Sequence, residues 1–149
     1  HDPFGASLIS NGGLRILGSD VNTDVLESAV HGCFAEELLS PIPATFSKRY
    51  FDLASDKNNP CHRIKPEIQK LIQFRQFNLM SPDYPIATKF QLIFCRNVLY
   101  YLQSERRDFL IKKLVDHLEE GGWLVLGITE SGYKIDKMKN RSISIYQKI

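Results

Sequence analysis

Short polar segments follow four runs of strand-forming residues, and together they could hold a small ligand. They are Asp20, the pair Asn78 and Leu79, the segment Arg96-Asn97-Val98, and the pair Thr129 and Glu130. Ligands of open α/β sheets bind beyond the carboxyl ends of the strands, so these are the positions at which a site is expected. An acidic residue that ends a strand before a helix accepts hydrogen bonds from ribose hydroxyls. Asp20 therefore indicates a nucleotide or a methyl donor, and the Asn amides could bind an adenine edge or a zwitterionic tail.

Each of these residues also has a structural explanation when it is taken alone. An Asp close to a helix N-terminus caps the helix or complements its dipole. Asn is tolerated in turns because its side chain bonds its own backbone. Tyr100 and Tyr101 follow the third segment, and such aromatics are more often core or rim residues than catalytic groups. The functional interpretation rests on the convergence of these residues at one edge of a sheet.

Other chemistries have little support in the sequence. The four histidines form no HxxxH or Cys/His pattern, so we expect no metal site. The absence of a P-loop, a GxSxG motif and a Ser/His/Asp order argues against a hydrolase. The formal net charge of +2, from 19 Lys and Arg against 17 Asp and Glu, predicts no nucleic-acid partner. No apolar run approaches the roughly 18 residues of a membrane-spanning helix, so we expect no membrane insertion.

Three cysteines, Cys33, Cys61 and Cys95, show neither CxxC nor metal-ligand spacing, and their number is odd. We therefore expect free thiols. Free thiols are typical of a reducing compartment, and the predicted location is the cytoplasm.

Hydrophobic periodicity predicts the elements that position these segments. Residues 14–19 form a strand that Asp20 follows, and Thr23–His31 form an amphipathic helix with Asn22 or Thr23 as N-cap and Gly32 at its end. Residues 52–60 are rich in Asp, Ser, Asn and Pro, which predicts a polar loop. Residues 63–65 predict a strand that Pro66 confines to a sheet edge, and residues 71–79 predict a further strand.

The C-terminal half carries the strongest periodic signals. Residues 91–95 predict a parallel strand buried on both faces. Residues 104–119 predict a helix that ends at Gly121-Gly122. Its inward residues are Phe109, Leu110, Ile111, Leu114, Val115 and Leu118. Residues 123–126 and 143–146 predict two more strands. Strands that alternate with helices predict an α/β fold with a mostly parallel sheet and an antiparallel last strand.

Five segments, in order along the chain, resemble the catalytic domain of the CheR-type chemotaxis receptor methyltransferases. With the family patterns, they are residues 19–26 (TDIDxxxL), 48–51 (xRYF), 77–79 (xNLL), 94–102 (FCRNVxIYF) and 121–131 (GGxLxLGHSE). FCRNV at residues 94–98 is the most specific. The resemblance implies a Rossmann-like class I methyltransferase fold. It also implies a protein-glutamate O-methyltransferase that converts S-adenosyl-L-methionine to S-adenosyl-L-homocysteine.

The resemblance assigns roles to residues of this sequence. Asp20 would bind the ribose of the cofactor, and Asn78, Leu79, Arg96, Asn97 and Val98 would line the rest of the S-adenosylmethionine site. We expect Tyr101 to position the methyl or the glutamate, and Arg96 to order the loop or meet a carboxylate. No general base is expected, because a glutamate with a free-solution pKa of about 4.3 is already ionised at neutral pH.

The implied partner is the cytoplasmic domain of a chemoreceptor, whose glutamate side chains would be modified. Residues 1–149 would form one methyltransferase domain that is incomplete at its N-terminus, with a small antiparallel β-subdomain inserted at about residues 46–77. In some family members this subdomain docks on a receptor tail.

The sequence departs from the family pattern at several points. Ile128 replaces the His of GHSE. The helical N-terminal domain, the first strand and its Gly-rich GxSxGEE loop are absent, and His1-Asp2-Pro3-Phe4 resembles the tail of that loop, EEPY. We therefore expect the chain to be part of a longer methyltransferase. Its first strand would lie between the strand ending at Ser19 and the strand ending at Cys95.

Two other functions stay open at this point. A degenerate, non-catalytic CheR-like interaction module would account for the missing loop and for Ile128. An NAD-binding Rossmann domain would account for Asp20, but it would not explain the Arg96-Asn97-Val98 segment, and GxGxxG is absent.

Overall fold

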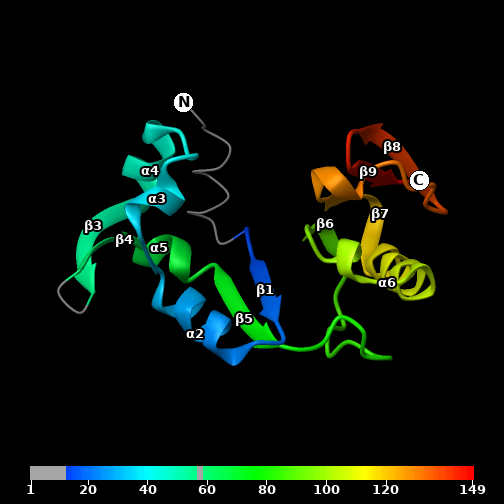
Figure 1. The fold of residues 1–149 in the computed structure, drawn as a ribbon, viewed down its shortest axis with the longest axis horizontal. Helices are drawn as coiled ribbons and strands as arrows, with labels where there is room; N and C mark the ends of the chain where they lie inside the picture. The colour runs from blue at the N-terminus through cyan, green and yellow to red at the C-terminus, as the bar shows by residue number, and fades with distance from the viewer. Residues whose placement is uncertain (1–12, 57–58) are drawn as a thin grey trace. The chain divides into compact units, whose positions relative to one another are not determined.

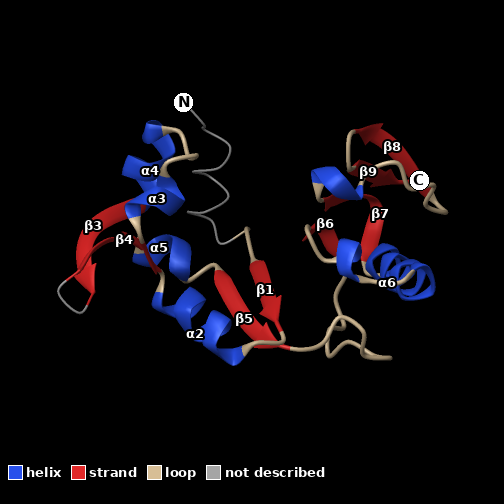
Figure 2. Ribbon diagram, in the orientation of Figure 1, coloured by secondary structure: helices blue, strands red, loops and turns tan. Residues whose placement is uncertain are grey.

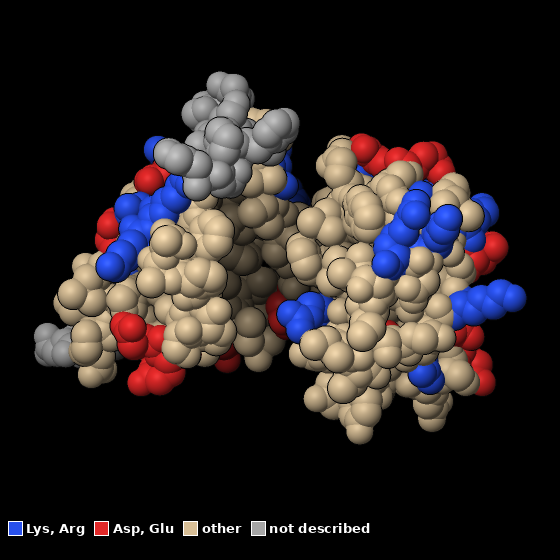
Figure 3. Space-filling view, turned by 90° about the horizontal axis from the view of Figure 1, so that it is seen from above, with Lys and Arg blue, Asp and Glu red and all other residues tan. Residues whose placement is uncertain are grey.

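The computed structural model describes residues 13–56 and 59–149. The chain divides into two compact units, His1–Asn78 and Leu79–Ile149, which are described separately below. The residues His1 to Phe4, in which the end of the Gly-rich loop was expected, lie outside the described part. Figure 2 shows helices and strands in both units, and Figure 3 shows charges of both signs on each.

The first unit contains a parallel pair of strands covered by a helix (Figure 1). Strand β1 (Ile16–Asp20) pairs with β5 (Ile72–Gln76), so that Asp20 stands opposite Gln76. Helix α2 (Thr23–His31) packs against both strands. The Asn22 side chain caps α2 by accepting a hydrogen bond from the Asp24 amide at 2.8 Å, and Gly32 ends it in the left-handed region at φ 64°. The bounds and the caps predicted for this helix are confirmed.

A separate antiparallel sheet follows in the same unit. Its strand order is β2 (Cys33–Phe34), β4 (Asn59–Ile64), β3 (Phe51–Asp56). Two short helices, α3 (Glu36–Leu39) and α4 (Ala44–Tyr50), connect β2 to β3, and α5 (Pro66–Gln69) connects β4 to β5. The polar loop predicted for residues 52–60 is therefore wrong, because most of these residues belong to the β3-β4 hairpin. Pro60 is accommodated because β2 pairs only with His62 and Arg63, which leaves β4 with a single neighbour at Pro60.

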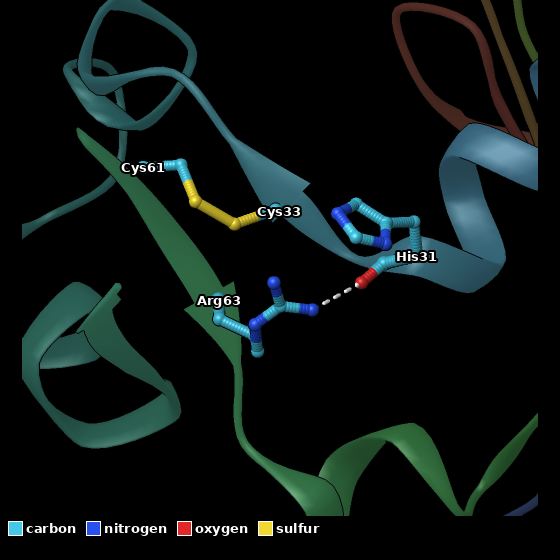
Figure 4. The surroundings of a disulfide bond; sticks show 4 residues. All are labelled: His31, Cys33, Cys61 and Arg63. Carbon is cyan, nitrogen blue, oxygen red and sulfur yellow. Dashed lines mark hydrogen bonds between the residues drawn. A yellow bond between two sulfur atoms is a disulfide. The ribbon is translucent and has the colours of Figure 1, made fainter. Parts of the chain in front are cut away.

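Two further predictions for this unit are corrected. Residues 63 and 64 lie on the central strand β4 and not on an edge, because Pro66 falls outside the strand at the start of α5. Cys33 and Cys61 form a disulfide with their Cα atoms 5.7 Å apart, so only Cys95 is a free thiol (Figure 4). Cys33 pairs with Arg63, two residues from Cys61, which places the two cysteines diagonally on one face of the sheet.

The second unit is built on one four-stranded sheet of order β6-β7-β9-β8. Strands β6 (Phe90–Cys95) and β7 (Leu118–Leu126) are parallel, and β9 (Ile145–Lys148) and β8 (Met138–Ser142) continue the sheet in antiparallel pairs. Helix α6 (Ser104–Asp116) connects β6 to β7. Together with the β1-β5 pair, these parallel strands and the antiparallel β9 give the predicted α/β, Rossmann-like fold. In the described part of the chain, β1 pairs only with β5, and β6 only with β7.

Four details of the second unit differ from prediction. Helix α6 ends at Asp116, and Gly121 and Gly122 lie inside β7. Position 122 requires Gly, because an added Cβ would lie 2.9 Å from the Glu119 carbonyl oxygen. Leu118 is buried as the first residue of β7, not on the helix. Phe109 is 41% exposed, so it does not face the core. Strand β6 is not buried on both faces, since Phe94 is 66% exposed.

The core of the second unit lies between α6 and the sheet. It is formed by Cys95, Leu99, Leu110, Ile111, Leu114, Val115, Leu118, Leu124, Leu126, Ile135 and Tyr146. None of the helices in residues 13–56 and 59–149 has the length and apolar content that a bilayer-spanning helix requires.

Candidate functional site

The first predicted group of site residues lies at the carboxyl end of the β1-β5 pair. Asp20 ends β1, is half-buried, and accepts a hydrogen bond from the Asn22 amide through Oδ1 at 2.9 Å. Its Oδ2 has no partner among the described residues. The amide of Phe77 donates to the Asp20 carbonyl at 3.2 Å, and Asn78 follows it with an exposed side chain. The structure thus brings Asp20 and Asn78 to the same strand end.

The turn at Asp20 is held from a second side. Gln76 Nε2 donates to the Val21 carbonyl at 2.9 Å, which fastens the start of the β1-α2 connection to the end of β5. Asp20 therefore has a structural role, but not the helix cap that was weighed for it, because its Oδ1 orders this connection and Asn22 caps α2. The same geometry leaves the second carboxylate oxygen for a hydroxyl donor.

The second predicted group lies at the carboxyl end of β6. Arg96 and Asn97 have exposed side chains, and Val98 packs against the core of the second unit. Asn97 has a left-handed backbone with φ 59°, a conformation that Asn adopts more readily than most residues. The 3-10 helix η1 (Leu99–Tyr101) follows directly. The chain therefore turns sharply at Asn97, with two polar side chains presented to solvent.

Tyr101 ends this segment with 81% of its surface exposed, and its ring contacts Tyr100 edge-on at 5.5 Å between centroids. The short helix η2 (Ile128–Glu130) lies against η1. Ile128, at the position of the family's His, is 71% exposed on η2. Ile128 therefore contributes an apolar surface where a His would offer a ring nitrogen.

Leu79 belongs to a segment that is fastened to α6. Tyr84 donates its hydroxyl to the Leu79 carbonyl at 2.5 Å, and Lys113 donates to the carbonyls of Ser81 and Pro82. The Lys113 ammonium also lies 4.0 Å from the centre of the Tyr84 ring, a cation-π contact. Burial, and then the charge that Cys95 could carry, raise the pKa of Tyr84 to about 12, so its hydroxyl keeps the proton that it donates.

Glu130 organises the second group. The sequence placed it after a strand, among the positions at which a site is expected, but assigned it no binding or catalytic role. Its side chain is 1% exposed, and Oε2 accepts hydrogen bonds from the amides of Gly127 at 2.8 Å and Asn97 at 2.9 Å. Oε1 accepts from the Tyr100 amide at 3.1 Å. Burial alone would raise the pKa of Glu130, but the backbone amides of Gly127, Tyr100, Asn97 and Leu99 together lower it. The carboxylate is therefore held in its charged form.

Gly127 provides the space for this contact. A Cβ at this position would lie 2.6 Å from Glu130 Oε2 and 2.8 Å from Asn97 Oδ1. Ser144 Oγ donates to the Gly127 carbonyl at 2.6 Å and fixes the following peptide group of the same residue. In the sequence, the only signal for this arrangement is an acidic residue three positions after a Gly that follows a buried strand.

The sequence profile of the family described as "CheR methyltransferase, SAM binding domain" matches residues 7–146. This chain belongs to that family. Chemotaxis protein methyltransferase 2 of Pseudomonas aeruginosa is 34% identical over 118 residues, which are 79% of this chain and 42% of the relative. A chemotaxis protein methyltransferase of Borreliella burgdorferi is 30% identical and covered to 41%, and that of Escherichia coli is 28% identical and covered to 41%. The CheR-family chain thus spans less than half of the length of these relatives.

Among solved structures, the glycopeptide N-methyltransferase MtfA is similar with a TM-score of 0.46 and 15% identity, over 78% of this chain and 38% of MtfA.

S-adenosylmethionine is the cofactor of the CheR family, and the residues of this chain suit it. The molecule carries ribose hydroxyls, an adenine base and a tail with an amino and a carboxylate group. Asp20 offers a carboxylate oxygen at a strand end, and Asn78 and Asn97 offer exposed amides. Arg96 offers an exposed guanidinium, which binds carboxylates bidentately. The donor and acceptor types therefore match the polar groups of the cofactor.

Proposed function

We propose that the protein to which this chain belongs transfers a methyl group from S-adenosylmethionine to glutamate side chains of a chemoreceptor, and so forms methyl esters. The observation that carries this proposal is the family match over residues 7–146. It is supported by chemotaxis methyltransferases of three bacteria that are 28% to 34% identical. The exposed polar turn after β6 is the part of the described structure that suits this chemistry.

We propose that Asp20 binds the ribose and that Asn78, Leu79, Arg96, Asn97 and Val98 line the rest of the cofactor site. The backbone positions support this, because Asp20 and Asn78 lie at the carboxyl ends of the parallel strands β1 and β5, and Arg96, Asn97 and Val98 follow the parallel strand β6. Val98 and Leu79 would supply apolar contacts, since both pack partly against the core of the second unit and remain half-exposed.

Tyr101 and Arg96 are proposed as the residues that meet the reacting groups. When bound, S-adenosylmethionine supplies an electrophilic methyl group on a positively charged sulfur. The substrate carboxylate is ionised at neutral pH, so the chain needs to align it and not to deprotonate it. The exposed guanidinium of Arg96 can orient a carboxylate, and the exposed hydroxyl of Tyr101 can donate a hydrogen bond to one.

The proposed domain organisation is one methyltransferase domain over residues 1–149, with a small β-subdomain inserted at about residues 46–77. The β3-β4 hairpin supports it, because this antiparallel hairpin falls within those limits and pairs with neither β1 nor β5. We further propose that the protein acts in the cytoplasm, where the modified glutamates of a chemoreceptor would lie.

The test uses the full-length protein, methyl-labelled S-adenosylmethionine and the cytoplasmic domain of a chemoreceptor from the same organism. We expect label on the receptor that base releases as methanol, which is diagnostic of a carboxyl methyl ester. The matched control is a receptor domain with its candidate Glu residues changed to Gln, which should take up no label.

Calorimetry of the same protein separates the competing functions. We expect heat with S-adenosylhomocysteine and none with NAD. No heat with either ligand would favour a non-catalytic module, and heat with NAD alone would contradict the proposal.

A further inference from the structure

Glu130 is a buried charge without a cationic partner in the described part of the chain. It is 1% exposed, whereas the buried Lys148 lies beside Glu120 and the carbonyls at the end of α6. Burying an unpaired carboxylate is costly unless hydrogen bonds replace its hydration. All of the hydrogen bonds to the Glu130 carboxylate come from backbone amides. The position of this carboxylate is therefore tied to the shape of the backbone around it.

The amides come from two different segments. Gly127 follows β7, and Asn97, Leu99 and Tyr100 follow β6. Since β6 and β7 are parallel neighbours, one carboxylate fastens together the carboxyl ends of both strands. This is the edge of an α/β sheet at which ligands bind.

The segment that Glu130 holds would not keep its shape unaided. Asn97 has φ 59°, a left-handed backbone that is less favourable than the usual regions for any residue other than Gly. The side chains of Arg96, Asn97 and Tyr101 are exposed, so no surrounding core fixes them. Their positions therefore depend on the backbone of the turn, and that backbone depends on the carboxylate.

We propose that Glu130 is a positioning residue for the cofactor site: its carboxylate holds the Asn97–Tyr101 turn in the shape that presents Arg96, Asn97 and Tyr101 to S-adenosylmethionine and its substrate. This inference rests on the proposed function. Glu130 touches neither the cofactor nor the substrate; it acts through the amides of the turn.

Glu130→Gln tests the proposal with almost no change in side-chain size. Gln keeps one acceptor oxygen and replaces the other with an NH₂ donor. In one orientation the NH₂ faces the amides of Asn97 and Gly127, and in the other it faces that of Tyr100. In either orientation the NH₂ group of Gln faces a backbone N–H that needs an acceptor, so at least one hydrogen bond to the turn is lost. The side chain still fills the same space, so the packing around it is kept.

The measurements are made on the full-length protein. We expect the dissociation constant of S-adenosylhomocysteine and the KM for S-adenosylmethionine to rise by about tenfold or more, in keeping with lost hydrogen bonds to a charged group. We expect kcat to fall less than KM rises, because the turn supplies binding contacts first. The backbone amide signals of Asn97, Gly127 or Tyr100 should shift in NMR spectra, which reports the released turn directly.

Leu114→Ala is the matched control. Leu114 is 4% exposed in the core of the same unit and has no contact with the Glu130 carboxylate, so its loss should lower the melting temperature and leave ligand affinity within about twofold of wild type. If Glu130 has a purely structural role, Glu130→Gln should also lower the melting temperature and leave the ligand affinity within about twofold of wild type. Unchanged affinity in Glu130→Gln would overturn the inference.

Gly127→Ala keeps the test decisive if Glu130→Gln does not fold. It retains the charge but adds a Cβ that would lie 2.6 Å from Oε2, so the carboxylate must move away from the Asn97 amide. Because the same Cβ also approaches Asn97 Oδ1, weaker ligand binding supports the inference when the amide signal of Tyr100, which bonds Glu130 Oε1, shifts with it. Weaker binding with an unshifted Tyr100 signal, or wild-type binding, overturns it. If the wild-type protein itself binds no S-adenosylhomocysteine, the proposed function fails and the inference fails with it. If wild type binds and the variants bind equally well, only the inference fails.

Discussion

The two units of this chain are stabilised in different ways. The second unit buries a contiguous apolar core in which Leu99, Leu110, Leu118 and Leu124 are fully buried. In the described part of the first unit, the buried hydrophobic residues are only Leu39 and Cys61. Helix α2 buries no residue at all. Apolar packing therefore accounts for the second unit and not for the first.

Covalent and polar links take the place of a core in the first unit. The Cys33–Cys61 disulfide ties β2 to β4. The last carbonyls of α2 accept hydrogen bonds from Gln69 Nε2 at 2.6 Å and from Arg63 at 3.0 Å, and the carbonyl of Gly32, which ends the helix, accepts one from the Ile64 amide at 2.9 Å. Figure 4 shows the disulfide beside the contact between Arg63 and His31. The comparison predicts that core substitutions lower the stability of the second unit most. It also predicts that the first unit is destabilised by the loss of a single disulfide or hydrogen bond.

The largest expected effect is in the core of the second unit. Leu124→Ala should lower the free energy of unfolding by about 2–5 kcal/mol, because it removes a fully buried side chain and leaves a cavity. The control in the first unit is Leu53→Ala, at a side chain that is 78% exposed, and it should change the stability by less than about 0.5 kcal/mol. Urea denaturation of the full-length protein measures both. Equal effects of the two substitutions would contradict the comparison.

Loss of the disulfide should come next. Cys33 and Cys61 are 28 residues apart, and opening a loop of this size costs about 3 kcal/mol. Mass spectrometry of peptides from unreduced protein should show the cross-link, and a reductant should lower the melting temperature of the first unit. The Cys33→Ser/Cys61→Ser double variant is the control, since a reductant should leave it unchanged. Two free thiols in protein isolated under thiol-blocking conditions would instead favour the sequence-based expectation of a reducing environment.

Lys148 tests a polar link inside the well-packed unit. Its ammonium is buried and donates to the carbonyls of Val115 at 3.1 Å and Leu118 at 2.8 Å. Lys148→Met keeps the length of the side chain and removes the charged donor to both carbonyls and the ion pair with Glu120, which should cost about 1–3 kcal/mol. The control is Lys139→Met on β8, where the side chain is exposed and little change is expected. Thermal denaturation compares the two variants.

The smallest effect is expected at the start of α2. Asn22→Ala removes the bond that its side chain accepts from the Asp24 amide and should cost about 1 kcal/mol. Asn22→Asp keeps an acceptor oxygen and should retain most of the stability. Hydrogen exchange of the amides in the first turn of α2 measures both. If Asn22→Ala has no effect, the first unit depends less on single links than the structure indicates.

Signals from neighbouring residues in the sequence were sufficient to predict the features that depend only on neighbouring residues, such as a helix and its caps. Helix α2 lies where its periodicity and caps placed it, and Asp20 and the Arg96-Asn97-Val98 segment lie at strand ends as the alternation of strands and helices indicated. The roles of these residues toward the cofactor stay predictions.

Features that depend on pairing between distant residues could not be predicted from the sequence. The β3-β4 hairpin contains Asn59 and Pro60, which are typical of loops, and its strands form because they pair with each other. The Cys33–Cys61 pair depends on the register between β2 and β4. The role of the Glu130 carboxylate could not be predicted for the same reason, since its amide partners Asn97 and Tyr100 lie 33 and 30 residues earlier in the chain.

The close approach at Gly127 limits how this region can change by substitution. Asn97, Gly127 and Glu130 share one small volume, so a side chain at position 127 collides with the other two. A methyl group there becomes tolerable only if the acid is shortened and the Asn97 side chain also gives way, as in Gly127→Ala combined with Glu130→Asp and Asn97→Gly. The three positions should therefore vary together, and a library that randomises them one at a time would discard combinations that fold.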